Sequence, residues 1–123
     1  MRLVSRGAIL VKVYAGLHPA DAACADVVRR AGAAALGNSE AWLVHERDLL
    51  RISFEGLYFP EDEVIAALDA YLPAQAQGKL DVLDLEDWEL RRYAREDGSF
   101  RMVRRDLNQV LEYSSERAMP QLL

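Results

Sequence analysis

The stretch Trp88–Leu107, WELRRYAREDGSFRMVRRDL, predicts a β-hairpin and is the starting point for the fold. Its centre, Asp97-Gly98, is a strong two-residue turn signal, because a tight hairpin turn needs positive φ angles that Asp tolerates and Gly adopts freely. Apolar and polar residues are mixed on both sides of this turn, as expected for strands. We therefore expect two antiparallel strands between residues 88 and 107.

Alternation along the hairpin decides which side chains share a face. If Glu96 pairs with Ser99 across the turn, one face carries three arginines, two aromatic residues and a methionine. This group, called the hairpin face below, comprises Arg91, Tyr93, Arg95, Phe100, Met102 and Arg104. The opposite face carries a core group near the base of the hairpin, formed by Trp88, Leu90, Val103 and Leu107. The hairpin face is therefore expected to be exposed.

Three roles fit an exposed hairpin face. Its rings and arginines could stack bases and bind phosphates. They could equally form a protein interface, where aromatic residues, Met and Arg are enriched. Arginine stems could also simply cover the rings on a solvated sheet face. Between Glu89 and Asp106, six arginines meet four acidic residues, which leaves a local charge of 6 − 4 = +2. This balance favours a solvated face first, a protein interface second and nucleic acid third.

Outside the hairpin, the chain alternates between strand and helix patterns. Apolar residues at alternate positions predict strands, whereas apolar residues three or four apart, opened by proline or a capping residue, predict helices. A helix capped by Ser39 is the alternative to a strand over residues 41–46. The expected elements are strands 8–14, 41–45 and 49–54, helices 20–36, 60–72 and about 107–117, and a polar connector at 74–79.

The helix expected from Pro60 has the clearest pattern. Three acidic residues follow Pro60, at the positive end of the helix dipole. Its apolar stripe comprises Val64, Ile65, Leu68, Tyr71 and Leu72. Just before it, Tyr58 and Phe59 are expected to pack the start of the helix onto the core. In the earlier helix, Pro19 is expected in the first turn and Asp21 at the positive end.

The element order β-α-β-β-α-β-β-α predicts an α+β fold, namely a two-layer sandwich with helices packed on one face of a mainly antiparallel sheet. The 123 residues are the usual size of one domain. We therefore expect a single domain over residues 1–123, with a loose tail from about 118. The hydrophobic fraction of 51% and the charged fraction of 28% exclude a disordered chain.

Composition also narrows the functional classes. The net charge of −5 repels phosphates on average, so nucleic acid could bind only at a local basic patch. Arginine outnumbers lysine thirteen to two, a bias that a GC-rich bacterial genome would produce. Lys12 interrupts the apolar run near the N-terminus, which argues against a signal peptide. No apolar run reaches the roughly 20 residues that span a bilayer. We therefore expect a soluble, cytoplasmic protein that does not bind membranes.

Neither a catalytic site nor a metal site is expected. The carboxylates of LDVLDLEDWE (80–89) lack the spacing of an EF-hand loop and are expected to form an acidic strand lead-in that pairs with nearby arginines. Cys24 is the single cysteine, which excludes an intrachain disulfide. It lies among alanines on a helix as a small core residue, although exposure near the helix start would lower its pKa. His18 and His45 are not adjacent to Cys24 in the sequence, so they could approach it only if the fold brings them together.

These patterns favour a non-enzymatic binding or protein-interaction module without a cofactor. A protein partner, or a second copy of the chain, would dock on Tyr93, Phe100 and Met102, and the arginines of the hairpin face would supply charge complementarity. The alternative function is a nucleic-acid or anionic-ligand binder that uses the same arginines. An enzyme that uses Cys24 or the acidic segment ranks last.

Overall fold

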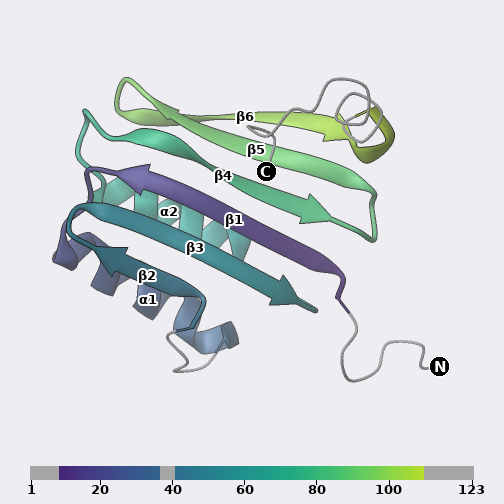
Figure 1. Ribbon diagram of the computed structural model, residues 1–123, viewed down its shortest axis with the longest axis horizontal. Coiled ribbons are helices and arrows are strands. Elements are labelled where there is room, and N and C mark those ends of the chain that lie inside the picture. The colour runs from purple at the N-terminus through teal and green to yellow at the C-terminus, as the bar shows by residue number, and fades with distance from the viewer. Residues whose placement is uncertain (1–8, 37–40, 110–123) are drawn as a thin grey trace.

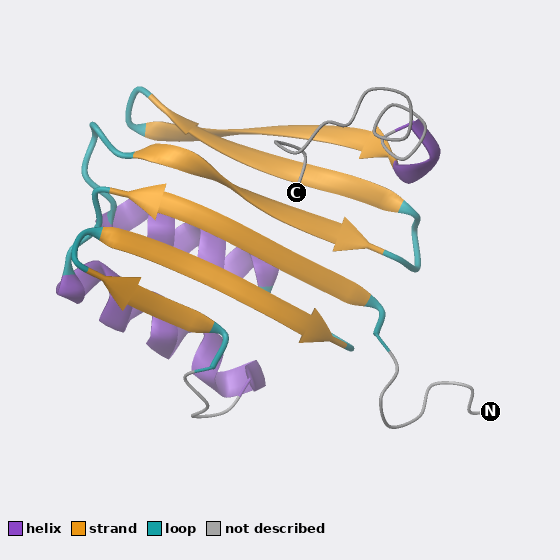
Figure 2. Ribbon diagram, in the orientation of Figure 1, coloured by secondary structure: helices purple, strands orange, loops and turns teal. Residues whose placement is uncertain are grey.

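The computed structural model describes residues 9–36 and 41–109. These residues form one six-stranded sheet, with helices α1 and α2 on one of its faces (Figures 1 and 2). The elements are β1 (Val11–His18), α1 (Ala22–Leu36), β2 (Leu43–Glu46), β3 (Leu49–Gly56), α2 (Glu61–Tyr71), β4 (Gln77–Asp84), β5 (Glu89–Glu96) and β6 (Ser99–Asp106). Residues 107–109, the last ones described, are helical.

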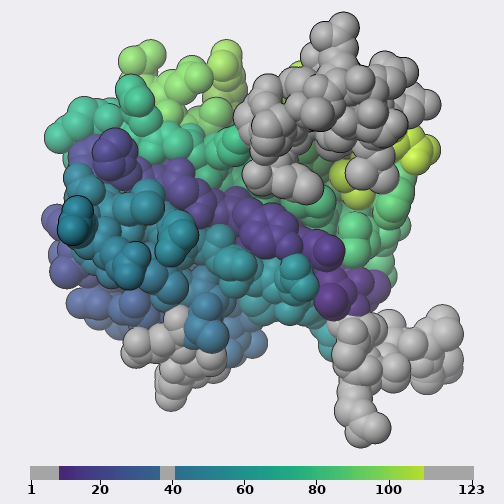
Figure 3. All heavy atoms as spheres, viewed as in Figure 1, coloured from purple at the N-terminus to yellow at the C-terminus, as the bar shows by residue number. Residues whose placement is uncertain are grey.

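The predicted fold class is confirmed, because every neighbouring pair of strands is antiparallel and the helices share one face. The strand order is β2-β3-β1-β4-β5-β6, so β1 lies in the middle of the sheet. The space-filling view shows β1 running diagonally across the face opposite the helices (Figure 3). The two edges are the short strand β2 and the longer strand β6.

Strand β4 is the one element that differs from the expected order. The connector and acidic lead-in expected over residues 74–89 contain an eight-residue strand that pairs with both β1 and β5. Leu80 and Val82 are buried at alternate positions on the helix-covered face, as a strand pattern requires. Asp81 lies between them and is also buried. A buried carboxylate between two buried apolar residues hides the alternation that identifies most strands.

The core lies between the helix layer and the sheet. Val13, Leu50 and Leu80 come from three adjacent strands and are 0% exposed. Trp42 packs edge-on against Phe59, with ring centroids 5.8 Å apart. Of the two alternatives for residues 41–46, the strand is correct, since β2 begins directly after Trp42. A Cβ atom at Gly32 would lie 2.7 Å from the Trp42 ring, so α1 and this ring fit closely together.

Both described helices begin near their predicted positions. Asp21 accepts a 2.8 Å hydrogen bond from the Cys24 backbone N–H at the start of α1, which is how a capping carboxylate satisfies an unpaired donor. Pro19 precedes the helix, after a cis peptide bond, and does not occupy its first turn. In α2, Val64 and Leu68 form the predicted buried stripe.

Some aromatic residues are not buried as predicted. Phe59 is buried against the core, whereas Tyr58 is 60% exposed and Tyr71 is 53% exposed, so neither tyrosine anchors α2. At the base of the hairpin, Leu90 and Leu107 form the expected small core, but Trp88 and Val103 are exposed. Most of the expected closing helix (107–117), and the tail from about 118, lie outside the described residues. Within the described part of the chain, no helix is both long and apolar enough to cross a membrane.

Candidate interaction surface

The pairing of β5 with β6 follows the register predicted from the turn. Glu96 pairs with Ser99, and the three pairs that make up the hairpin face are Arg95 with Phe100, Tyr93 with Met102, and Arg91 with Arg104. Asp97 and Gly98 form the turn with φ angles of 52° and 84°, both in the left-handed region. The hairpin face therefore exists as one continuous set of neighbouring side chains.

The expected exposure of the hairpin face is wrong for its β5 half. Arg95 is 2% exposed, and the Arg91 side chain is 15% exposed. Tyr93 and Phe100 are half-buried. The reason is that this face is the one on which α2 packs, so the helix covers β5. Met102 and Arg104 on the edge strand β6 remain exposed.

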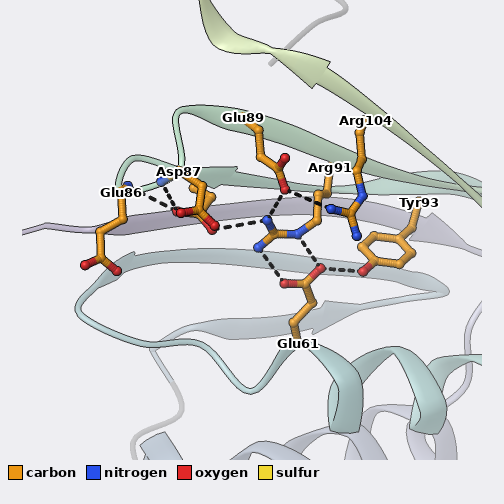
Figure 4. A network of polar contacts seen from close by, with 8 residues as sticks. Glu61, Glu86, Asp87, Glu89, Arg91, Tyr93 and Arg104 are labelled. Carbon is orange, nitrogen blue, oxygen red and sulfur yellow. Dashed lines mark hydrogen bonds and ion pairs between the residues drawn. The ribbon is translucent and has the colours of Figure 1, made fainter.

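Arg91 joins α2 to the sheet through a network of ion pairs (Figure 4). Its guanidinium donates two 2.9 Å hydrogen bonds to the carboxylate of Glu61, the first residue of α2. It also pairs with Asp84 and Glu89. The Tyr93 hydroxyl donates to Glu61 as well. Arg91 thus anchors the N-terminus of α2 through Glu61, and all three carboxylates already face a cation rather than offering a vacant acidic site.

The pKa values in this network follow from its hydrogen bonds. The bonds that Arg91 donates to Glu61 raise the Arg91 pKa further, despite partial burial. Burial and the bond to Glu61 raise the pKa of Tyr93 above its ordinary value. Burial alone would raise the pKa of Asp84, but the Asp87 backbone N–H and the Arg91 guanidinium outweigh it and lower that pKa. Arg91 and Asp84 are thus charged at neutral pH, and Tyr93 is neutral.

Arg95 makes a second anchor at the other end of α2. Its guanidinium donates to the Asp69 carboxylate at 2.7 Å and to the backbone carbonyl of Leu72 at 3.2 Å. The same group lies 5.0 Å from the centre of the Phe100 ring, in a cation–π contact. A cation at the C-terminal end of a helix is also favoured by the helix dipole. Arg95 therefore fixes both the helix end and the Phe100 ring.

The distance between the two ion-paired residues of α2 matches the distance between their arginine partners on β5. Glu61 and Asp69 are eight residues apart, which corresponds to about 12 Å along a helix. Arg91 and Arg95 are four residues apart, which corresponds to about 13 Å along a strand. Helix α2 can therefore lie along β5 with both of its ends attached. The arginines that the hairpin face contributes from β5 are thus structural.

A groove remains between α2 and β6, where the helix does not cover the hairpin. Its volume is about 350 Å³. Ile65 and Ala66 line it from the helix, and Phe100 and Met102 line it from the edge strand, with Tyr93 between them. Asp62 and Asp69 lie on its helix side. This groove is an apolar recess with a polar rim, which is the usual form of a docking site for a partner side chain.

Strand β6 is strongly exposed beside the groove. Seven of its eight residues are exposed. Among the described strands it pairs only with β5, so its outer row of backbone N–H and C=O groups faces away from the sheet. The Arg101 and Arg104 side chains are 72% and 62% exposed, and their ion pairs, at 3.4 and 3.5 Å, are long. This edge presents both apolar side chains and positive charge.

No family model, curated protein or solved structure matches this protein.

The acidic segment pairs with arginines, as the sequence predicted. Asp81 is buried and accepts two 2.7 Å hydrogen bonds from Arg92, which lies directly opposite on β5. Asp84 accepts from the backbone N–H groups of Glu86 and Asp87 and closes the turn between β4 and β5. Within residues 9–36 and 41–109, no group of three acidic, His or Cys side chains could hold a metal ion.

A hollow of about 450 Å³ on the sheet face opposite the helices was not anticipated from the sequence. Its polar lining includes Tyr14, Arg51, Ser53, Lys79 and Asp81. The Tyr14 hydroxyl donates to Glu55 at 2.6 Å, and burial together with this bond raises the Tyr14 pKa to about 12. Residues from four neighbouring strands line the hollow, so only the strand order could have revealed it.

The candidate nucleophile is inert in this structure. Cys24 is 0% exposed, as expected of a small core residue. Burial, followed by the nearby Asp21 carboxylate, raises its pKa to about 11, so the thiol is protonated at neutral pH. His45 is engaged elsewhere, because its Nε2 lies 2.7 Å from the backbone carbonyl of Ala20. His18 is exposed at the end of β1.

Proposed function

We propose that this protein is a non-enzymatic protein-interaction module that docks a partner on the groove between α2 and β6. One observation carries the proposal: an apolar recess of about 350 Å³ lies directly beside a strand with seven of its eight residues exposed. Small apolar recesses of this kind accept the anchor side chains that dominate binding energy. Three residues of the hairpin face, Tyr93, Phe100 and Met102, line this recess.

The groove is also held in place by contacts at both ends of α2. Arg91 and Arg95 hold α2 against β5 at both ends, and Arg95 also holds the Phe100 ring. A surface that is already in its binding conformation loses little conformational entropy when a partner docks. The buried arginines of the hairpin face therefore contribute by positioning the groove, and the charge that meets the partner comes from β6.

The alternative function, a nucleic-acid or anionic-ligand binder, has less support. Arg91, Arg92 and Arg95 each bind a carboxylate, so their charge is largely neutralised. Asp62 would also repel a phosphate at the groove. Arg101, Arg104 and Arg105 remain exposed on β6, and three cations support only weak, salt-sensitive phosphate binding.

The test compares two aspartate substitutions on exposed edge-strand residues. Met102 is 38% exposed in the groove, and Val44 is 41% exposed on the opposite edge strand. Tagged wild-type protein, Met102→Asp and Val44→Asp are purified from source cells, and co-purifying proteins are quantified by mass spectrometry. We expect Met102→Asp to lose at least about tenfold of the enriched partner, which corresponds to about 1.4 kcal/mol. Val44→Asp should retain the partner.

Two controls make the comparison decisive. Urea unfolding must show that both variants fold as wild type does, and sedimentation must establish whether the enriched partner is a second copy of the chain. Equal recovery with Met102→Asp and wild type would reject the groove as the docking site. A monomeric wild-type protein that enriches nothing would reject the interaction module itself.

A further inference from the structure

The exposed edge of β6 differs from the other edge of the sheet in length and charge. Strand β6 has eight residues, whereas β2 has four. Along β6, three arginines and one aspartate give a net charge of 3 − 1 = +2, on a protein whose total is −5. Among the described strands only β5 pairs with β6, and a long edge of this kind is a template for one more strand. The positive charge of β6 favours acidic residues in that added strand.

The side chains of β6 alternate between two chemical patterns. On the helix face, Phe100 and Met102 line the groove and are followed by Arg104. On the opposite face, Arg101 and Arg105 flank Val103. A strand laid along this edge would place its own side chains beside these residues, because paired strands keep their faces in common. It would therefore need apolar residues toward the groove and acidic residues opposite the three arginines.

A second copy of β6 does not meet this requirement. It would bring three more arginines to the same edge, and like charges opposed across a strand pair are destabilising. Lysine and arginine on edge strands commonly prevent such self-pairing. Nucleic acid would use the arginines but could not replace the main-chain hydrogen bonds that the edge offers. A polypeptide satisfies both the backbone and the charges.

We infer that β6 binds an extended acidic segment of a protein partner as an additional strand of the sheet, with apolar side chains of that segment directed into the groove between α2 and β6. This inference rests on the proposed interaction function and names its partner by chemistry. Main-chain hydrogen bonds supply affinity, and the alternate side chains supply specificity. The anchored groove fixes the position of the segment along β6.

The probe is the acetylated and amidated hexapeptide EETVEL. In antiparallel pairing with residues 100–105, its glutamates lie opposite Arg101, Arg104 and Arg105, and its valine and leucine face the groove. Two further versions are N-methylated at the odd or at the even positions. Only alternate N–H groups of a strand point toward its neighbour, so we expect one version to bind like EETVEL and the other to bind at least tenfold more weakly. Amide NMR should map the binding to β6.

A charge-reversed pair tests the selectivity. The double variant Arg101→Glu with Arg105→Glu should bind EETVEL at least tenfold more weakly and should prefer the lysine peptide KKTVKL. The control Arg30→Glu with Arg51→Glu makes the same change in net charge on exposed residues elsewhere, and should bind EETVEL within about twofold of wild type.

The outcomes separate this inference from the proposed function. Equal binding of both N-methylated peptides would show charge attraction without strand pairing and would overturn the inference. Absence of EETVEL binding, or tighter binding of a single-stranded RNA hexamer, would also overturn it. If Met102→Asp still abolished partner capture in those cases, the interaction module would stand and only the acidic strand would be rejected.

Discussion

Asp81 shows how a single residue can carry a charge into the middle of the sheet. It is 1% exposed, yet Arg92 lies directly opposite it and donates two hydrogen bonds of 2.7 Å. A bidentate guanidinium matches the geometry of a carboxylate and satisfies both oxygens. These hydrogen bonds also raise the pKa of Arg92. Arg92 therefore stays charged beside the Asp81 carboxylate, and a buried polar group of either residue left without the other would destabilise the fold.

Removing Arg92 alone should be far more damaging than removing the pair. Arg92→Met leaves a buried carboxylate unpaired, which we expect to lower the free energy of unfolding by about 3 kcal/mol. The double variant Asp81→Val with Arg92→Met replaces the pair by apolar side chains and should lie within about 1 kcal/mol of wild type. Urea unfolding of the two single variants and the double variant measures the coupling. Additive losses would contradict the argument.

At the scale of elements, β4 enters the centre of the sheet through a close backbone contact. Gly78 has a φ of 126°, which side-chain-bearing residues rarely adopt. A Cβ atom there would lie 2.0 Å from the Gly16 carbonyl oxygen on β1. Gly98, in the hairpin turn, also has a positive φ, but its nearest neighbour would be the Ala74 Cβ at 3.7 Å. A substitution at Gly98 would therefore add backbone strain alone, whereas one at Gly78 would add both backbone strain and a steric clash.

Alanine substitutions at these glycines should have unequal costs. Gly98→Ala adds only left-handed strain, and we expect it to lower the free energy of unfolding by about 1 kcal/mol. Gly78→Ala adds a clash with backbone that cannot move without separating β1 from β4, so a loss of about 3 kcal/mol or more is expected. Thermal and urea unfolding check both variants. Similar losses at the two positions would show that β1 and β4 adjust freely.

At the scale of the whole molecule, the local signals of the sequence specify the elements well. Asp97-Gly98 predicts the hairpin and its register, because the turn leaves one favourable pairing. Pro60 and the acidic residues after it predict the start of α2 for a similar reason. The fold class then follows from the order of these elements. The position of the interaction groove along β6 needs more than this, because α2 forms half of it.

The burial of the hairpin face depends on contacts between distant residues. Arg95 is buried because Asp69 and the Leu72 carbonyl, 26 and 23 residues away, accept its hydrogen bonds. No local pattern encodes such a pair, and an unpaired arginine is almost always exposed. The local pattern does not predict β4 for the same reason, since Asp81 is compatible with burial only once Arg92 lies opposite. Charges that pair across elements are therefore where sequence reasoning fails in this protein.

Asp84, which accepts hydrogen bonds from the Asp87 backbone N–H and from Arg91, should make stability depend on pH in acid. The pKa of Asp84 is lower in the folded protein than its ordinary value of 3.8. The unfolded chain therefore binds protons first as pH falls, so the stabilisation from Asp84 is complete above about pH 4 and is lost as pH falls through the folded pKa.

Asp84→Asn lacks this titration. Urea unfolding between about pH 2 and 7 should show wild type more stable than Asp84→Asn at neutral pH, with a gap that narrows below about pH 4. A gap that stays constant across this range would mean that the ionised Asp84 carboxylate does not stabilise the folded protein.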